Sequence, residues 1–176
     1  ISSSITDTAV DVFIYDTSKD SDGGAWRKRT SHTSWYNETL ETATRGSRRE
    51  FPAVAVIVAE TSKVTIYDGD DPDLPMWMVF NSVAGKYGAI YGGRTIKKVI
   101  SINGEIFAVD SLDSIARWGF ITDTMKSEAV SGRWNSNRNL ADRNPSDSNN
   151  HWSRYNSTAT LVGYPLNDVA MTVLPN

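Results

Sequence analysis

The sequence predicts an all-β fold of consecutive antiparallel meanders, arranged as the first blades of a β-propeller-like domain with long polar loops. Two observations predict this fold. Strand-length stretches of β-branched and aromatic residues recur, as at residues 64–67 (VTIY), and such residues fit a pleated surface better than a helix. Clusters of Gly, Asp, Asn and Pro separate these stretches, and those residues favour turns.

Four largely apolar strands are expected in the first half of the chain. Residues 10–16 and 53–58 are apolar at almost every position, which is typical of strands that are covered on both faces. Residues 63–80 contain a strand, an acidic turn around Gly69 and a returning strand. The second and third of these strands are separated by only a few polar residues, so we expect them to form a hairpin.

The remainder of the first half is less regular. Residues 26–29 (WRKR) are expected to form a returning strand at a sheet edge, because cations stand where other strands carry apolar residues. Residues 35–43 are expected to form one or two helical turns, with Gly46 ending the helix.

A three-stranded meander is the clearest unit of the second half. Residues 97–102 alternate enough for a strand, Asn103-Gly104 is a strong hairpin signal, and residues 105–109 pair back. Residues 113–120 supply the third strand, and residues 122–130 continue the sheet. Residues 168–174 (DVAMTVL) are expected to open a further unit, so we expect residues 1–176 to be a single partial propeller-like segment of a longer chain.

One local pattern occurs three times: an apolar strand, an Asp at its exit, a polar turn and a Trp on the next strand. The Asp residues are 52 and 42 residues apart, within the range of propeller repeats. Equivalent positions in a repeat are distributed around the fold, which favours a structural role over a shared site. The three pairs are Asp16 with Trp26, Asp68 with Trp77, and Asp110 with Trp118.

Composition excludes several classes of function. A net charge of −3 with 22% charged residues gives no electrostatic signature for nucleic acid, so no nucleic-acid partner is expected. The absence of cysteine removes disulfides and thiolate chemistry. No apolar run approaches the roughly 18 residues of a membrane span. The Gly-rich residues 85–94 match no nucleotide-binding motif, so no cofactor is expected.

Two acidic loops carry the hard oxygen ligands that Ca²⁺ prefers. They lack the third alternating acid and the bidentate Glu of a calcium-binding loop, so turns capped by Asp side chains are the favoured interpretation. We therefore expect no metal site. The weak calcium candidates are Asp16, Asp20, Asp22, Asp68 and Asp70.

Catalysis has weaker support in the sequence than binding. The two histidines, His32 and His151, have no metal-binding or triad spacing. A glycan-active hydrolase would need two carboxyl groups that converge across a groove, one of them with a raised pKa. The acids available for that alternative are Asp68, Asp70, Asp71 and Asp110.

Residues 131–158 are expected to form a long polar loop or insertion. Aromatic, amide and guanidinium groups are mixed there, as on polar recognition surfaces for carbohydrate or protein. A solvated loop ordered by a neighbouring subunit is an equally good interpretation. The candidate recognition residues are Trp134, Asn137, Arg138, Arg143, His151, Trp152, Arg154 and Tyr155.

Residues 11–38 (DVFIYDTSKDSDGGAWRKRTSHTSWYNE) and 47–81 (SRREFPAVAVIVAETSKVTIYDGDDPDLPMWMVFN) resemble virion-associated structural proteins of marine tailed bacteriophages, whose longer members look like β-propellers. Residues 167–176 resemble the strand that opens a later blade, whereas the insertion at 133–158 has no counterpart. These motifs carry no catalytic residues. The resemblance implies a propeller segment of a larger tail or fibre component, with a role in assembly or at the host surface.

We therefore expect a non-catalytic structural protein of a tail, fibre or adhesion assembly, located in the virion as an extracellular particle. Its partners would be other virion proteins, further copies of itself, and a host-surface glycan or protein. The alternatives are a glycan-binding module and a carbohydrate-active enzyme.

Overall fold

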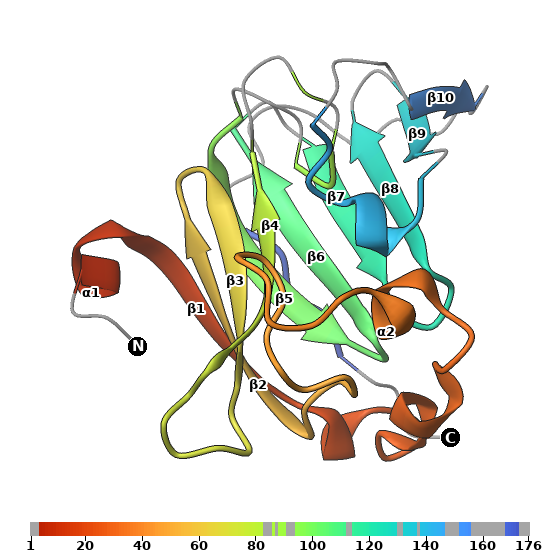
Figure 1. Ribbon diagram of the computed structural model, residues 1–176. Helices are drawn as coiled ribbons and strands as arrows, with labels where there is room; N and C mark the ends of the chain where they lie inside the picture. Colours follow the sequence, from red (N-terminus) through yellow and green to blue (C-terminus); the bar gives the residue numbers. More distant parts are fainter. Residues whose placement is uncertain are drawn as a thin grey trace.

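The computed structural model describes residues 4–82, 86, 88–90, 94–111, 114–129, 132–136, 138–146, 152–155 and 168–172. The described residues form two antiparallel sheets with a few short helices (Figure 1). The all-β prediction and its meander arrangement are confirmed.

The first sheet has the strand order β1-β2-β3-β4, so consecutive strands pair along the chain. Its strands are β1 (Ala9–Asp16), β2 (Val54–Glu60), β3 (Lys63–Asp68) and β4 (Met76–Asn81). Before and between them lie α1 (Ser4–Thr8), the 3-10 helices η1 (Thr17–Lys19) and η2 (Ala25–Arg29), and α2 (Ser34–Asn37).

The second sheet is a six-stranded meander with the order β10-β9-β8-β7-β6-β5. Its strands are β5 (Ile96–Ile102), β6 (Glu105–Asp110), β7 (Ser114–Gly119), β8 (Thr124–Ala129), β9 (Gly132–Ser136) and β10 (Trp152–Tyr155). A 3-10 helix, η3 (Leu140–Asp142), lies between β9 and β10. The range 131–158, expected as a polar loop, thus contains two strands and a helical turn.

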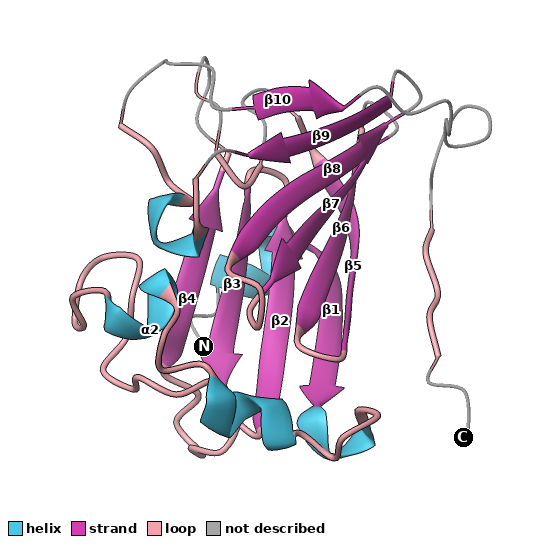
Figure 2. Ribbon diagram, turned by 90° about the vertical axis from the view of Figure 1, so that its right-hand side faces the viewer, coloured by secondary structure: helices cyan, strands magenta, loops and turns pink. Residues whose placement is uncertain are grey.

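The two sheets come together along their first strands. β1 and β5 are each an edge strand, and they lie side by side in both views (Figure 2). The Asp11 carboxylate accepts a hydrogen bond from the Val99 backbone N–H at 2.8 Å, and Lys98 Nζ lies 3.4 Å from the same carboxylate. A side chain therefore joins two strand edges that share no backbone ladder.

Two local predictions were wrong. Trp26 begins no strand but lies in η2, where its ring is buried against Phe51. The left-handed Gly24 (φ 78°) turns the chain directly into this helix. Residues 168–172 form no strand. Residues 173 and 174, which belong to the same prediction, lie outside the described part of the chain.

The three-unit repeat does not map onto three blades. Asp16 and Asp68 end two strands of the same sheet, β1 and β3, and only Asp110 belongs to the second sheet, at the end of β6. What the three Asp residues share is local, because each accepts a backbone N–H from a residue two to four positions further along the chain. The donors are Ser18, Asp70 and Ser114 respectively.

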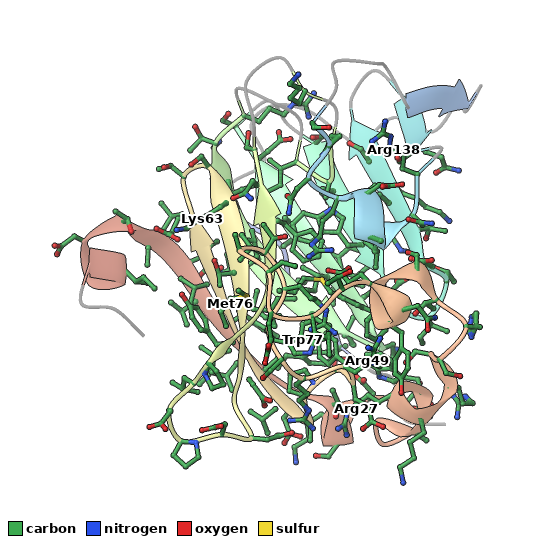
Figure 3. All side chains as sticks on the ribbon, viewed as in Figure 1. Arg27, Arg49, Lys63, Met76, Trp77 and Arg138 are labelled. Atoms are coloured by element: carbon green, nitrogen blue, oxygen red, sulfur yellow. The ribbon has the colours of Figure 1, made fainter. Side chains whose placement is uncertain are left out.

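Aromatic side chains fill the core between the sheets. Phe80 of β4 stacks on Trp118 of β7 with ring centroids 4.2 Å apart and planes 5° apart. The ring centroid of Phe51, from the loop before β2, lies 4.8 Å from the ring centroids of both Trp77 and Phe120. Figure 3 shows Trp77 within this crowded interior, whereas Lys63 lies at the rim of the sheet.

The indole N–H groups of the buried tryptophans attach loops to this core. A buried indole N–H needs an acceptor, and here the acceptors lie in segments that are not strands. The four bonds run from Trp26 to the Asp20 carboxylate, from Trp35 to Phe120 O, from Trp77 to Glu50 O, and from Trp118 to Ala89 O, at 2.7–3.1 Å.

The outer edge of β4 is covered by a close approach of the chain. Gly46 N–H donates to Trp77 O at 2.9 Å, and Val79 N–H donates to Thr44 O at 3.0 Å. A Cβ at Gly46 would lie 2.0 Å from Met76 O, so only glycine allows this approach. The predicted helical turn at 35–43 is confirmed in part, because α2 ends at Asn37 and an irregular loop leads to Gly46.

Replacing Phe51 with alanine should cost about 3–5 kcal/mol of unfolding free energy, because the ring is fully buried among rigid aromatic neighbours. Met171→Ala is the matched control. Its side chain is 49% exposed, so we expect a change within about 0.5 kcal/mol. Urea unfolding of the two variants measures both values, and equal small losses would show that Phe51 is not central to the core.

Candidate functional site

A pocket of about 350 Å³ lies where β1 meets β5. One wall comes from β1 and the start of the following loop, a second from the end of β5, and a third from the chain segment at 171–172. Its lining residues are Phe13, Ile14, Tyr15, Asp16, Lys19, Asp20, Ser101, Ile102, Met171 and Thr172. The pocket therefore combines an apolar wall with three hydroxyls, an amine and two carboxylates.

A hydrogen-bond network, here called the junction clamp, closes one side of this pocket. It consists of Tyr15, Asp20, Trp26, Asn103 and Gly104. The Tyr15 hydroxyl donates to Asp20 Oδ2 at 2.5 Å and accepts from Gly104 N–H at 2.8 Å. Asp20 also accepts from Trp26 Nε1 at 2.7 Å and from Asn103 N–H at 2.7 Å. The clamp holds the β5–β6 turn against the loop that follows β1.

Burial raises the pKa of Tyr15 far above its ordinary value, and the hydrogen bond to Asp20 adds to the rise. The hydroxyl therefore stays neutral and keeps its proton directed at the Asp20 carboxylate. Such a phenol is a fixed structural group and a poor proton donor or acceptor for chemistry in the pocket.

The two carboxylates of the pocket do not resemble an acid–base pair. Both carboxylate oxygens of Asp20 accept hydrogen bonds within the junction clamp. Hydrogen bonds from the Ser18 side chain and backbone lower the pKa of Asp16. A glycosidase acid needs a raised pKa, whereas the pKa of Asp16 is lowered.

The solvent-facing side of β1 carries an apolar stripe, defined here as Val10, Val12 and Ile14. Their side chains are 47%, 54% and 67% exposed, although β1 is a strand of the main core. Strand alternation places Phe13 and Tyr15 on the opposite, inner face. Register places Val12 and Ile14 opposite Val58 and Val56 of β2; Val58 is buried and Val56 is partly exposed, so the exposed stripe lies mainly on β1.

Asp68 and Asp70, two of the weak calcium candidates, are occupied by protein donors. The Arg48 guanidinium donates to both carboxylates, at 2.7–2.9 Å. Asp70 also accepts the backbone N–H groups of Ala53 and Val54 at 2.8 and 2.9 Å. Partial burial alone would raise the pKa of Asp70, but these backbone bonds and Arg48 outweigh it, and the pKa is lowered.

The other acidic candidates also serve turns. Asp22 accepts from Gly24 N–H at 3.0 Å and pairs with Arg29 at 2.7 Å. Asp110 pairs with Arg94 at 2.7 Å and accepts the Ser114 hydroxyl at 2.5 Å. Among the described residues, no group of three or more His, Asp or Glu side chains is placed to hold a metal ion. The described helices include none long and apolar enough to span a membrane.

The candidate recognition residues are divided by the structure. Arg143 is 1% exposed and belongs to the interior. Arg138 is half-buried and lies at the opposite end of the molecule from Arg27 (Figure 3). Trp134 lies on β9, and Trp152, Arg154 and Tyr155 lie on its partner strand β10. Asn137 and His151 are outside the described residues.

Arg143 is part of a buried charge cluster that sequence reasoning did not find. Its guanidinium makes two bonds to the Glu38 carboxylate at 2.8 and 2.9 Å, and a third to Val79 O at 2.8 Å. Arg45 stacks 4.4 Å over the Trp77 ring, and its Nε lies 3.8 Å from Glu38. Burial lowers the pKa of Arg45 to about 10, which leaves it charged at neutral pH.

Comparison with protein-family models, curated proteins and solved structures gave no match to this chain. The functional assignment therefore rests on the pocket, the apolar stripe and the charge clusters of this molecule.

Stability should fall in acid because of Asp70. The folded-state pKa of Asp70 lies below its ordinary value of 3.8, so its contribution to the free energy of unfolding is present above that value. The contribution is lost as pH falls through the lower, folded-state pKa. Asp70→Asn should therefore flatten the decline of unfolding free energy below about pH 5. Urea unfolding across this pH range measures the slope, and an unchanged slope in the variant would contradict the assignment.

Glu38→Gln should lower the free energy of unfolding by about 3–5 kcal/mol, because it leaves the buried guanidiniums of Arg45 and Arg143 without their counter-charge. The matched control is Asp22→Asn, which neutralises the partner of the exposed Arg29 and should cost less than about 1 kcal/mol. Equal costs for the two variants in urea unfolding would mean that the cluster has no special role.

Proposed function

We propose that this chain is a non-catalytic structural protein that packs against a second copy of itself within a larger assembly. The observation that carries the proposal is the apolar stripe. A strand that faces water on one side normally alternates polar and apolar residues, but β1 presents three large apolar side chains outward. Contiguous exposed apolar surface of this kind marks interaction sites.

Charges at the two ends of the stripe favour a second copy as the partner. Asp7 precedes β1 and Lys19 follows it, and both side chains are exposed. In a two-fold arrangement the two β1 strands cross antiparallel, so Lys19 of each copy approaches Asp7 of the other. This arrangement pairs opposite charges at both ends while the stripes bury one another.

The setting we propose is the virion of a tailed bacteriophage, in a tail, fibre or adhesion assembly. The resemblance of residues 11–38 and 47–81 to virion structural proteins supports this setting. In such assemblies the contacts between repeated subunits are the function, and a strand that presents apolar side chains outward suits that role.

A glycan-binding module is the second candidate, and the pocket beside β1 favours it. Its volume of about 350 Å³ is at the small end of the range for ligand sites, and it offers hydroxyl, amine and carboxylate groups beside apolar walls. A carbohydrate-active enzyme has less support. In the described part of the chain, the carboxyl groups with shifted pKa values, Asp16, Glu60 and Asp70, are all shifted downward.

Sedimentation velocity of the wild type and of Ile14→Lys tests the proposal. We expect the wild type to self-associate at about 10 μM, and the variant to sediment as a monomer because a charge in the stripe would be buried unpaired. Thr122→Lys adds the same charge on an exposed turn and should leave association unchanged.

A wild type that stays monomeric would contradict self-assembly through the stripe. A monomer that binds glycans and loses binding when Lys19 is replaced by alanine would favour the second candidate instead.

A further inference from the structure

The β5–β6 turn contains Asn103-Gly104, the one Asn-Gly pair in the sequence. Both residues have positive φ, 51° and 70°, as a tight two-residue hairpin turn requires. Asn-Gly is also the dipeptide most prone to spontaneous deamidation, because glycine offers no side chain to hinder attack by its own backbone nitrogen.

The reaction needs freedom in this turn. The Gly104 backbone nitrogen loses its proton and attacks the Asn103 side-chain carbonyl carbon, and ammonia leaves as a five-membered succinimide ring forms. One water then opens the ring at either carbonyl to give aspartate or isoaspartate. The net change consumes one water and releases one ammonia, with no oxidant or cofactor.

The junction clamp, together with the neighbouring Ser21, restrains the groups that take part in this attack. Gly104 N–H donates to the Tyr15 hydroxyl at 2.8 Å, which holds the nucleophilic nitrogen in its protonated form. The Asn103 side-chain oxygen accepts from Ser21 N–H at 2.9 Å, which directs the amide toward the loop after β1. Asn103 N–H donates to Asp20 Oδ1 at 2.7 Å and fixes the turn from its other side.

Packing around Gly104 further restricts the motion of the turn. Gly104 is buried, and a Cβ added to it would lie 3.0 Å from atoms of the Trp26 ring. Trp26 is itself held by its bond to Asp20, so the ring under the turn cannot move unless the clamp opens. Because Tyr15 stays neutral, its hydroxyl keeps donating to Asp20 across the physiological pH range, so the clamp stays intact there.

We propose that Asn103 is a latent deamidation site, closed by the junction clamp and exposed when the loop containing Asp20 and Ser21 leaves the turn. A deamidated Asn103 therefore indicates that the β1–β5 junction of that molecule has been open. Aspartate at 103 places a second carboxylate beside Asp20, and isoaspartate lengthens the backbone of a two-residue turn. Both products disfavour reclosing, so a modified molecule stays open at this junction.

The test is peptide mapping by mass spectrometry after incubation in mildly alkaline buffer. In the folded wild type we expect Asn103 to remain intact, whereas in concentrated urea it should deamidate faster than any other asparagine of the chain. Equal rates at Asn103 in the folded and unfolded protein would overturn the proposal, and this arm needs no variant.

Tyr15→Phe tests the role of the clamp in the folded protein. Removing the hydroxyl deletes two buried hydrogen bonds, to Asp20 and from Gly104, and makes local opening more frequent, so Asn103 deamidation should rise about fivefold to tenfold. Tyr36→Phe is the control: its ring packs on Trp35 outside the clamp, and the rate at Asn103 should not change. A Tyr15→Phe protein with wild-type near-ultraviolet circular dichroism and a wild-type rate would show that the tyrosine does not protect the turn.

Discussion

The fold depends on the contact of Phe80 and Trp118, where one aromatic ring from each sheet stacks face to face in the core. The sheets meet along β1 and β5 through a side chain rather than a ladder of backbone bonds, so the interior must hold them together. Buried rings provide large apolar contact, and the indole N–H groups require acceptors. Because those acceptors lie in loops, packing of the core also determines where the loops lie.

This dependence explains why the charged and polar features are structural. Glu38 and Arg143 join α2 to the segment after η3, and Arg48 joins the loop before β2 to the turn after β3. Each carboxylate is matched to cations or backbone donors, which lowers the cost of burial. The apolar stripe on β1 is the exception, because it is neither polar nor covered by described residues.

Strand positions were predictable because local chemistry dictates them. β-branched runs favour strands, and the Asn103-Gly104 turn and the acidic turn after β3 carry residues that favour turns. Trp26 was misassigned because burial of its ring against Phe51 is a tertiary effect, and no local pattern reports it. The Asp and Trp spacing was real but arose from shared local chemistry at strand ends, since each Asp accepts a backbone N–H from a residue two to four positions further along the chain. The candidate site could be predicted only in part. Apolar residues on both faces of β1 predicted a strand covered on both faces, but Val10, Val12 and Ile14 are exposed on the outer face. The bond from Asn103 to Asp20 joins residues 83 positions apart, which no local pattern reports.

A double-mutant cycle between Phe80→Leu and Trp118→Leu tests most directly whether this aromatic contact holds the sheets together. The measured quantity is the difference between the unfolding free energy lost in the double variant and the sum of the two single losses. A stacked pair predicts a coupling of about 0.5–1.5 kcal/mol. A coupling below about 0.3 kcal/mol would contradict the account, since the two rings would then contribute to stability independently.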